Sequence, residues 1–202
     1  SRALPIHSGP VYHVSTAGSD SAGTGSEQYP LATIEKGIDS ASDGDTVLVA
    51  AGTYVENITW PAINGIKLIG SGEEDCIIDG NQQASVIRFE QDLGGIIDTT
   101  TLINGFTIQN GYAQGSSPSD RGGGIFCNNS NPTLTNVTIS ANSAEYDGGG
   151  IYCNDSDEPI LTSVTITANT ASLGGGIYCD NSSPILTNVS IADNSASDKG
   201  GG

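Results

Sequence analysis

The chain has little positive charge: six Lys and Arg stand against 23 Asp and Glu, for a formal net charge of −17 over 202 residues. A net negative charge repels phosphate backbones and anionic lipid headgroups. The cations are also scattered, at Arg2, Lys36, Lys67, Arg88, Arg121 and Lys199. Because no basic patch can form, we expect neither nucleic acid nor an anionic membrane as a partner.

Methionine is absent and the chain starts at Ser1, which predicts a processed product whose leader has been removed. No apolar run is long enough to cross a bilayer, so we expect no membrane insertion in this segment. The two histidines, His7 and His13, lie near the start and no CxxC pair occurs, so we expect no metal centre and no cofactor. Calcium, which takes oxygen ligands, is the one cation that the acidic composition suits.

Glycine, in contrast, is abundant, with 28 residues. One 26-residue unit occurs three times in the second half of the chain. The copies begin GGGIFCN at Gly122, GGGIYCN at Gly148 and GGGIYCD at Gly174, and a fourth starts at Gly200. Copy two has one extra residue after its cysteine and one fewer before the next triple glycine. Strands must keep register with their neighbours whereas surface turns can change length, so the repeat predicts stacked units.

Each unit contains three short segments of strand-forming residues: GIYC, PILT and VTI. One such coil cannot bury both of its faces, but stacked coils share a continuous core and pair their backbones. We therefore predict an all-β fold, a right-handed parallel β-helix. A leucine-rich or helical solenoid does not suit the frequent glycine turns, and a β-sandwich would need antiparallel hairpin signals.

A cap is expected at the N-terminal end, since an open first coil would expose sheet edges. Val11 to Ser15 alternates like an edge strand, and a Gly/Ser loop follows. Leu31, Ile34 and Ile38 have helical spacing, which predicts one short α-helix over Thr33–Ala41. The predicted divisions are a cap over 1–45, irregular coils over 46–121, and regular repeats over 122–202 in an array truncated at its C-terminus.

Several segments together resemble a known family: GDTVLVAAGTYVENITW, GIKLIGSG, IIDGN, GFTIQNG and the GGGIYC repeats. They are similar to the pectin-lyase-like right-handed parallel β-helix proteins of bacterial surfaces. The GGGI units also resemble the repeats of polymorphic outer membrane proteins, which are passenger domains or adhesins. The resemblance implies a secreted or cell-surface location, on a bacterial outer surface.

Cys127, Cys153 and Cys179 recur at the repeat spacing, so the coils would stack them in one column. They share a strand face with the apolar residue two positions earlier, which predicts a buried ladder. Cys76 is expected to be another inward residue. A disulfide between neighbouring coils is the alternative, and its formation depends on favourable Cβ directions.

Phe126, Tyr152 and Tyr178 fall on the opposite strand face and form a second column. We expect this column on the outer surface. It can stabilise coil stacking by cross-strand contact, or bind sugar rings through its aromatic faces. These three residues are the candidate substrate-binding residues.

Polar columns recur as well. Asn142, Asn169 and Asn194 follow the VTI segment, and we expect them to form a structural ladder of turn residues. Outward Thr and Ser columns are predicted at Thr135, Thr162 and Thr187, and at Thr138, Thr165 and Ser190. A flat array of Thr side chains is also suited to ice binding. However, β-branched residues favour strands in any case, so the columns are expected without that role.

No catalytic residue is predicted. The acids near the GIYC segment, such as Asp147 and Asp180, lie in variable turns, and the NTD, GHG and RIK signatures of polygalacturonases are absent. We expect a non-catalytic extracellular or cell-surface module, a stalk or adhesin-like segment that binds a glycan or a surface protein. The alternative is the N-terminal part of a polysaccharide lyase or glycoside hydrolase. An open C-terminal edge also predicts self-association.

Overall fold

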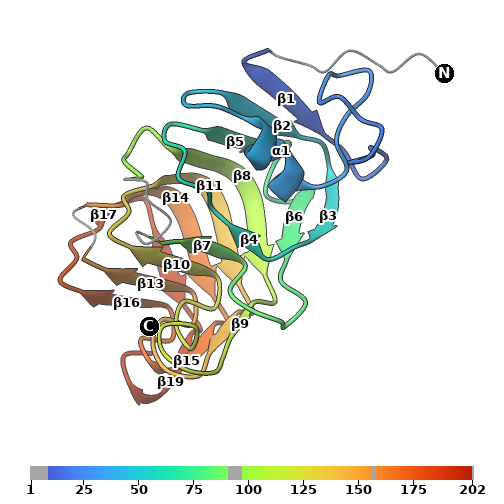
Figure 1. Ribbon diagram of the computed structural model, residues 1–202. Coiled ribbons are helices and arrows are strands. Elements are labelled where there is room, and N and C mark those ends of the chain that lie inside the picture. Colours follow the sequence, from blue (N-terminus) through green and yellow to red (C-terminus); the bar gives the residue numbers. More distant parts are fainter. Residues whose placement is uncertain (1–8, 91–96, 156–157, 202) are drawn as a thin grey trace.

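The computed structural model describes residues 9–90, 97–155 and 158–201, which wind into a right-handed parallel β-solenoid of about five turns. Figure 1 shows the coils stacked from the N-terminal end, where α1 lies, to the C-terminal end. Every pairing between named strands is parallel. The predicted fold class is confirmed.

The first coils are irregular in length. Their elements are β1 (Val11–Val14), α1 (Ile34–Ser40), β2 (Thr46–Val49), β3 (Gly52–Val55), β4 (Ile58–Thr59), β5 (Lys67–Gly70), β6 (Cys76–Asp79), β7 (Ile87–Phe89), β8 (Leu102–Gln109) and β9 (Tyr112–Ala113).

The three repeats supply the remaining strands. Copy one holds β10 (Ile125–Asn128), β11 (Thr133–Ser140) and β12 (Ser143–Ala144). Copy two holds β13 (Ile151–Asn154), β14 (Ile160–Thr167) and β15 (Thr170–Leu173). Copy three holds β16 (Ile177–Asp180), β17 (Ile185–Thr187), β18 (Ser190–Ala192) and β19 (Ser195–Lys199).

Three sheets form the walls of the solenoid. The largest has ten strands with the central order β1-β2-β5-β8-β11-β14-β17, and β3, β6 and β18 pair beside this path. The three GIYC-type segments pair with β7 and β4 of the irregular coils in a five-stranded sheet, β16-β13-β10-β7-β4. A four-stranded sheet, β19-β15-β12-β9, closes the coil.

The strand register explains the unequal turns of the repeat. Ile125 pairs with Ile151, which pairs with Ile177, at the constant repeat spacing. In the ten-stranded sheet, Thr133 pairs with Ile160 and Ile160 with Ile185, so the extra residue of copy two is absorbed between its strands. The strands stay aligned and the turns take up the length difference, as predicted.

Two features of the coil differ from the expected three short strands. The PILT and VTI segments run together as the eight-residue strands β11 and β14. Each strand bends where Asn136 and Ser163 adopt φ of 50° and 54°, a left-handed conformation that turns the chain without ending its pairing. The short strands of the four-stranded sheet were not predicted, because their Ser- and Ala-rich sequences carry little strand signal.

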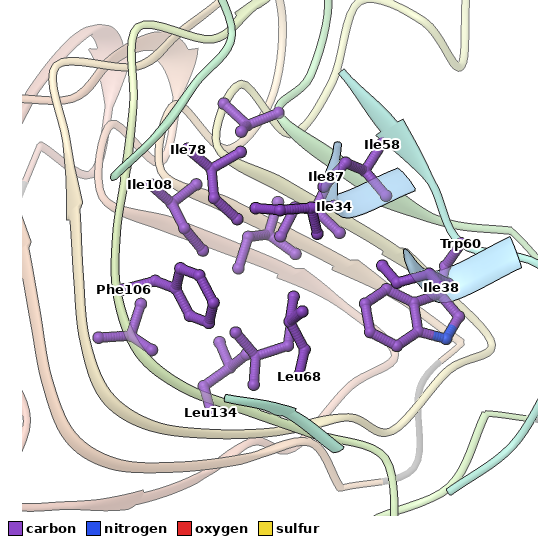
Figure 2. Close-up of a cluster of buried hydrophobic side chains, with 14 of the residues drawn as sticks. Ile34, Ile38, Ile58, Trp60, Leu68, Ile78, Ile87, Phe106, Ile108 and Leu134 are labelled. Atoms are coloured by element: carbon purple, nitrogen blue, oxygen red, sulfur yellow. The ribbon is translucent and has the colours of Figure 1, made fainter. Parts of the chain in front are cut away.

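The interior is a continuous apolar core. Figure 2 shows side chains from α1 and from successive coils meeting inside the solenoid, including Ile34, Ile58, Phe106 and Leu134. These four side chains are at most 2% exposed. Such burial is the main source of stability in a stack whose single coils could not fold alone.

The helix is confirmed within one residue at each end, and it closes the first coil. Thr33 caps its start by accepting a hydrogen bond from Lys36 N. Glu56 reaches from beyond β3 to accept bonds from Ile34 N and Glu35 N, both at 2.9 Å. Two free N–H groups at the helix start are thereby satisfied, which fastens α1 to the solenoid.

The cysteine column lies inside, as predicted, but its last member is exposed. Cys127 and Cys153 belong to the apolar core and Cys76 is also buried, whereas Cys179 lies in the last described coil and is exposed. The hydrogen bond with Cys153 and partial burial raise the pKa of the Cys179 thiol, which slows its reaction with Ellman's reagent. We still expect one thiol per native chain to be labelled ahead of the others, and all four after denaturation. Cys179→Ser should abolish this first phase, and labelling of a second thiol at the same rate would contradict the buried ladder.

Candidate functional site

A single column of side chains crosses the outer face of the five-stranded sheet. In register it runs through Thr59, Arg88, Phe126, Tyr152 and Tyr178. The Phe126 and Tyr152 rings stack with centroids 5.3 Å apart, and the Tyr152 and Tyr178 rings with centroids 5.8 Å apart. The Arg88 guanidinium lies 3.9 Å from the Phe126 centroid. The structure therefore brings the three predicted aromatic residues together.

Their expected exposure is wrong for two of the three. Phe126 and Tyr152 are each only 2% exposed, and Tyr178 is half-buried. Two arginines from neighbouring coils cover them: Arg88 lies over Phe126, and Arg121 lies 5.3 Å from the Tyr152 centroid. Cation–π contacts of this kind are favourable where water is excluded, so the column is a packed layer rather than an open surface.

Arg121 lies at the centre of a polar cluster on this face. Its Nη1 donates to Tyr152 Oη at 2.8 Å, and its Nε lies 3.3 Å from Asp147 Oδ2. Its guanidinium also lies 5.4 Å from the Tyr146 centroid. Arg121 and Asp147 are the residues before the triple glycines of copies one and two, so stacking places them side by side.

The cluster is nearly closed to solvent at Asp147, whose side chain is only 3% exposed. Burial raises the pKa of this carboxyl, and the nearby Arg121 guanidinium opposes that rise. Burial also raises the pKa of the Tyr152 hydroxyl. Among the described residues, Asp147 Oδ1, Asp120 Oδ1 and Arg121 Nε have no hydrogen-bond partner. A substrate cannot reach Asp147 without movement of the surrounding residues.

Replacing Arg121 by methionine is expected to destabilise the fold by about 3 kcal/mol at neutral pH, because it leaves a buried carboxylate without a counter-charge. The pKa of Asp147 should then rise further. A carboxyl whose pKa is raised on folding stabilises the fold most below its unfolded value, and this contribution is lost as pH rises through the folded pKa. The unfolding temperature of Arg121→Met should therefore fall more steeply than the parent's above about pH 4.

The matched control is the double variant Arg121→Met with Asp147→Asn, which removes both charges. We expect it to recover most of the stability and to lose the added pH dependence. Thermal unfolding followed by circular dichroism between acidic and neutral pH measures both effects. Equal instability of the single and double variants at all pH values would contradict the assigned charge pair.

A second candidate region is a hollow of about 500 Å³ on the outer side of the ten-stranded sheet. It is lined by Gly70, Ser71, Gly72, Glu73, Glu74, Asp75, Asn104, Gly105 and Asn136. Thr107 Oγ1 donates to the Glu73 carbonyl at 2.7 Å, and Thr138 Oγ1 to Glu73 Oε2 at 3.2 Å. These bonds hold the 71–75 loop against the sheet as a wall beside the strand bends.

The asparagine ladder after the VTI segment is confirmed and is structural. Asn142 and Asn169 are at most 1% exposed, and Asn142 Nδ2 donates to Asn169 Oδ1 at 3.0 Å. Asn169 Nδ2 donates in turn to Asn194 Oδ1 at 2.9 Å.

The predicted Thr columns also stand in register, with Thr135 opposite Thr162 and Thr138 opposite Thr165. The bends at Asn136 and Ser163 lie between the two columns. The two Thr columns therefore face outward as separate rows, not as one flat array.

The described ranges contain no group of three or more His, Cys, Asp or Glu side chains that could hold a metal ion. Their single helix is too short to cross a membrane.

Sequence reasoning missed the covering arginines and the acidic hollow. The signal for Arg121 and Asp147 was available, since the position before the triple glycine reads Arg, Asp, Leu and Lys in successive copies. Opposite charges at one repeat spacing indicate an ion pair between stacked coils. The hollow had no comparable signal, because the 71–75 loop lies outside the repeat.

Comparison with known proteins supports the architecture. No curated protein sequence matches the chain. A pectin methylesterase from Erwinia chrysanthemi superposes with a TM-score of 0.55 at 16% identity, over 86% of this chain and 54% of that one. A pectin methylesterase mutant in complex with a hexasaccharide superposes with a TM-score of 0.50 at 17% identity and the same coverage. The chain spans about half the length of these structures.

At such identities the structural likeness establishes the fold alone. The model of the family described as the right handed beta helix region matches residues 50–202. That match covers most of the chain, including all three repeats and the strands that pair with them. The chain therefore belongs to the right-handed β-helix family.

Proposed function

We propose that this stretch is a non-catalytic module of a secreted or cell-surface protein, a rigid stalk or adhesin-like segment whose outer surface binds a glycan. The observation that carries the proposal is how the repeated side chains are used. The Asn142–Asn169–Asn194 ladder inside the solenoid and the Phe126–Tyr152 stack on its outer side both join consecutive coils. Such ladders make a stiff rod, which suits a stalk.

The outer face of the ten-stranded sheet supports the binding part of the proposal. Asn136, Thr165 and Asn188 are exposed there, and their amides and hydroxyls can donate and accept hydrogen bonds. Strands hold these groups at regular positions, so a glycan that binds them would not have to order a loop.

A second candidate is the N-terminal part of a carbohydrate-active β-helix enzyme. Two observations favour it: the fold likeness to pectin methylesterases, and the juxtaposition of Arg121, Asp147 and Tyr152 beneath one face. This candidate requires that the surrounding residues move to admit a substrate to Asp147. A cation beside a carboxyl group of raised pKa is a common feature of catalytic sites.

One pair of measurements separates the candidates. The chain, and separately the full-length gene product, are screened for binding to immobilised polysaccharides and for release of methanol, unsaturated uronates or reducing ends. We expect the chain to bind at least one polysaccharide and to release no product. Turnover that Asp147→Asn abolishes would favour the enzyme, and absence of binding to every polysaccharide would overturn the proposed glycan-binding role.

A further inference from the structure

We propose that Cys153 and Cys179 are a modification site, at which a small-molecule disulfide such as oxidised glutathione converts the two thiols into a reversible disulfide. The bond joins the second repeat to the third, across the strands β13 and β16. It lies in the cysteine column inside the solenoid and is independent of the proposed glycan binding.

The two side chains already meet in the reduced chain. Cys153 and Cys179 pair in register across the parallel strands β13 and β16, and such strands lie about 4.8 Å apart. Disulfides form between residues whose Cα atoms are about 4.4–6.8 Å apart, so the register brings the pair within range. Their thiols are also hydrogen-bonded to each other. The side chains therefore point toward one another, as a disulfide requires.

Access to oxidant selects this pair within the column. Cys127 pairs with Cys153 in the same register and their thiols are hydrogen-bonded too, but both residues are at most 2% exposed. Cys76 is buried on β6, where its Sγ lies 3.6 Å from Ala50 O. Of the four cysteines, all of which lie in the described ranges, Cys179 alone is exposed. An oxidant therefore reaches the column at Cys179, whose thiol contacts that of Cys153.

The disulfide forms by two exchange steps. The Cys179 thiolate attacks one sulfur of oxidised glutathione, which forms a mixed disulfide and releases one glutathione thiolate. The Cys153 thiolate then attacks Cys179 Sγ and displaces the second glutathione. Two protein thiols thus lose two electrons and two protons, and one oxidised glutathione becomes two reduced molecules.

Both steps are slow at neutral pH, because the attacking groups are thiols of raised pKa. The hydrogen bond with Cys153 and partial burial raise the pKa of Cys179. The hydrogen bond with Cys127 is the largest cause of the raised pKa of Cys153, and burial adds to it. Since Cys153 is also enclosed in the core, its attack follows the modification of Cys179 as a separate, slower phase. The thiolate fraction grows about tenfold per pH unit below the pKa, so we expect disulfide formation to be about tenfold faster at pH 8 than at pH 7.

The experiment incubates the reduced native chain with excess oxidised glutathione and then alkylates the remaining thiols in denaturant. Chymotrypsin cleaves after Tyr152 and Tyr178, which places the three cysteines of the column on separate peptides for mass spectrometry. We expect one disulfide, between Cys153 and Cys179, that dithiothreitol reverses. A link between Cys127 and Cys153, a link between two chains, a lasting mixed disulfide at Cys179, or no reaction would each overturn the proposal.

Three variants assign the two steps, and circular dichroism checks that each variant folds. Cys153→Ser should retain glutathione on Cys179, because the second attacking thiol is gone, and Cys179→Ser should not react in the native state. The matched control, Cys127→Ser, removes a buried thiol of the same column and should form the same disulfide as the parent. Peptide mapping of the parent chain decides the outcome even where a variant does not fold.

The effect on the fold is measured separately by hydrogen exchange. Ile185 N and Ser195 N donate to Pro159 O and Asn169 O, and these bonds hold the third repeat on the second. Closing a disulfide between the same two coils should slow exchange of both amides about tenfold. Unchanged exchange in the oxidised chain would show that the bond does not join the repeats.

Discussion

Gly149→Ala is expected to prevent stable stacking of the repeats. A Cβ built on Gly149 would lie 2.4 Å from Thr170 O and 2.5 Å from Gly175 O, both backbone atoms. Gly175 belongs to the next coil, where Gly149 N already donates to Gly174 O at 3.2 Å. Neither carbonyl can move without breaking the stack. We expect a loss of at least about 3 kcal/mol in the free energy of unfolding.

Denaturant unfolding followed by circular dichroism measures this loss, and size-exclusion chromatography reports whether the variant remains compact. The control is Gly44→Ala, where φ is +82° and no atom lies within 4 Å of the added Cβ. That substitution meets only the left-handed backbone strain of about 1 kcal/mol. Equal losses for the two variants would show that glycine flexibility, not close approach of the coils, explains the triple glycine.

The triple glycine also illustrates what the sequence could predict. A constant spacing of Gly, Ile and Cys, with turns that exchange one residue, predicts stacked parallel coils because only backbone pairing requires so strict a register. Copy two and copy three pair as this reasoning expects, Ile151 with Ile177 and Ile160 with Ile185. The helix was predictable for the same reason, since Ile34 and Ile38 have helical spacing and Thr33 caps their start.

The candidate sites were less predictable because they depend on contacts outside the repeat. Alternation along a strand correctly placed Phe126 and Tyr152 opposite the cysteines, but it cannot tell whether other chain segments cover that face. Arg88 covers Phe126 from the preceding, irregular coil, at a separation that no repeat spacing encodes. The wall of the hollow likewise depends on Thr138 reaching Glu73 across two coils, which follows only from the folded register.

Asn169→Ala is expected to cause the second large loss of stability, because Asn169 is the middle member of the buried ladder. Its Oδ1 accepts from Asn142 N and Asn142 Nδ2, both at 3.0 Å, and its Nδ2 donates to Ile139 O at 2.9 Å. Alanine would remove these three bonds at a site where Asn169 is 0% exposed. Asn142 Nδ2 would keep its bond to Ile108 O, but Asn142 N would lose its acceptor. At about 1–3 kcal/mol for the orphaned Asn142 N–H and about 1 kcal/mol for each of the other two lost bonds, we expect a loss of about 3–5 kcal/mol.

The matched control is an asparagine of the next repeat that lies outside the core. Asn188 is exposed and has φ of 53°, so Asn188→Gly keeps the bend and removes only the surface bond to Ser163. We expect it to change stability by less than about 1 kcal/mol. Native-state hydrogen exchange adds a local measurement, because Asn169→Ala should accelerate exchange of Asn142 N, which donates to the lost oxygen. A large loss in the control, or unchanged exchange at Asn142, would show that the turn conformation rather than the buried ladder holds the coils together.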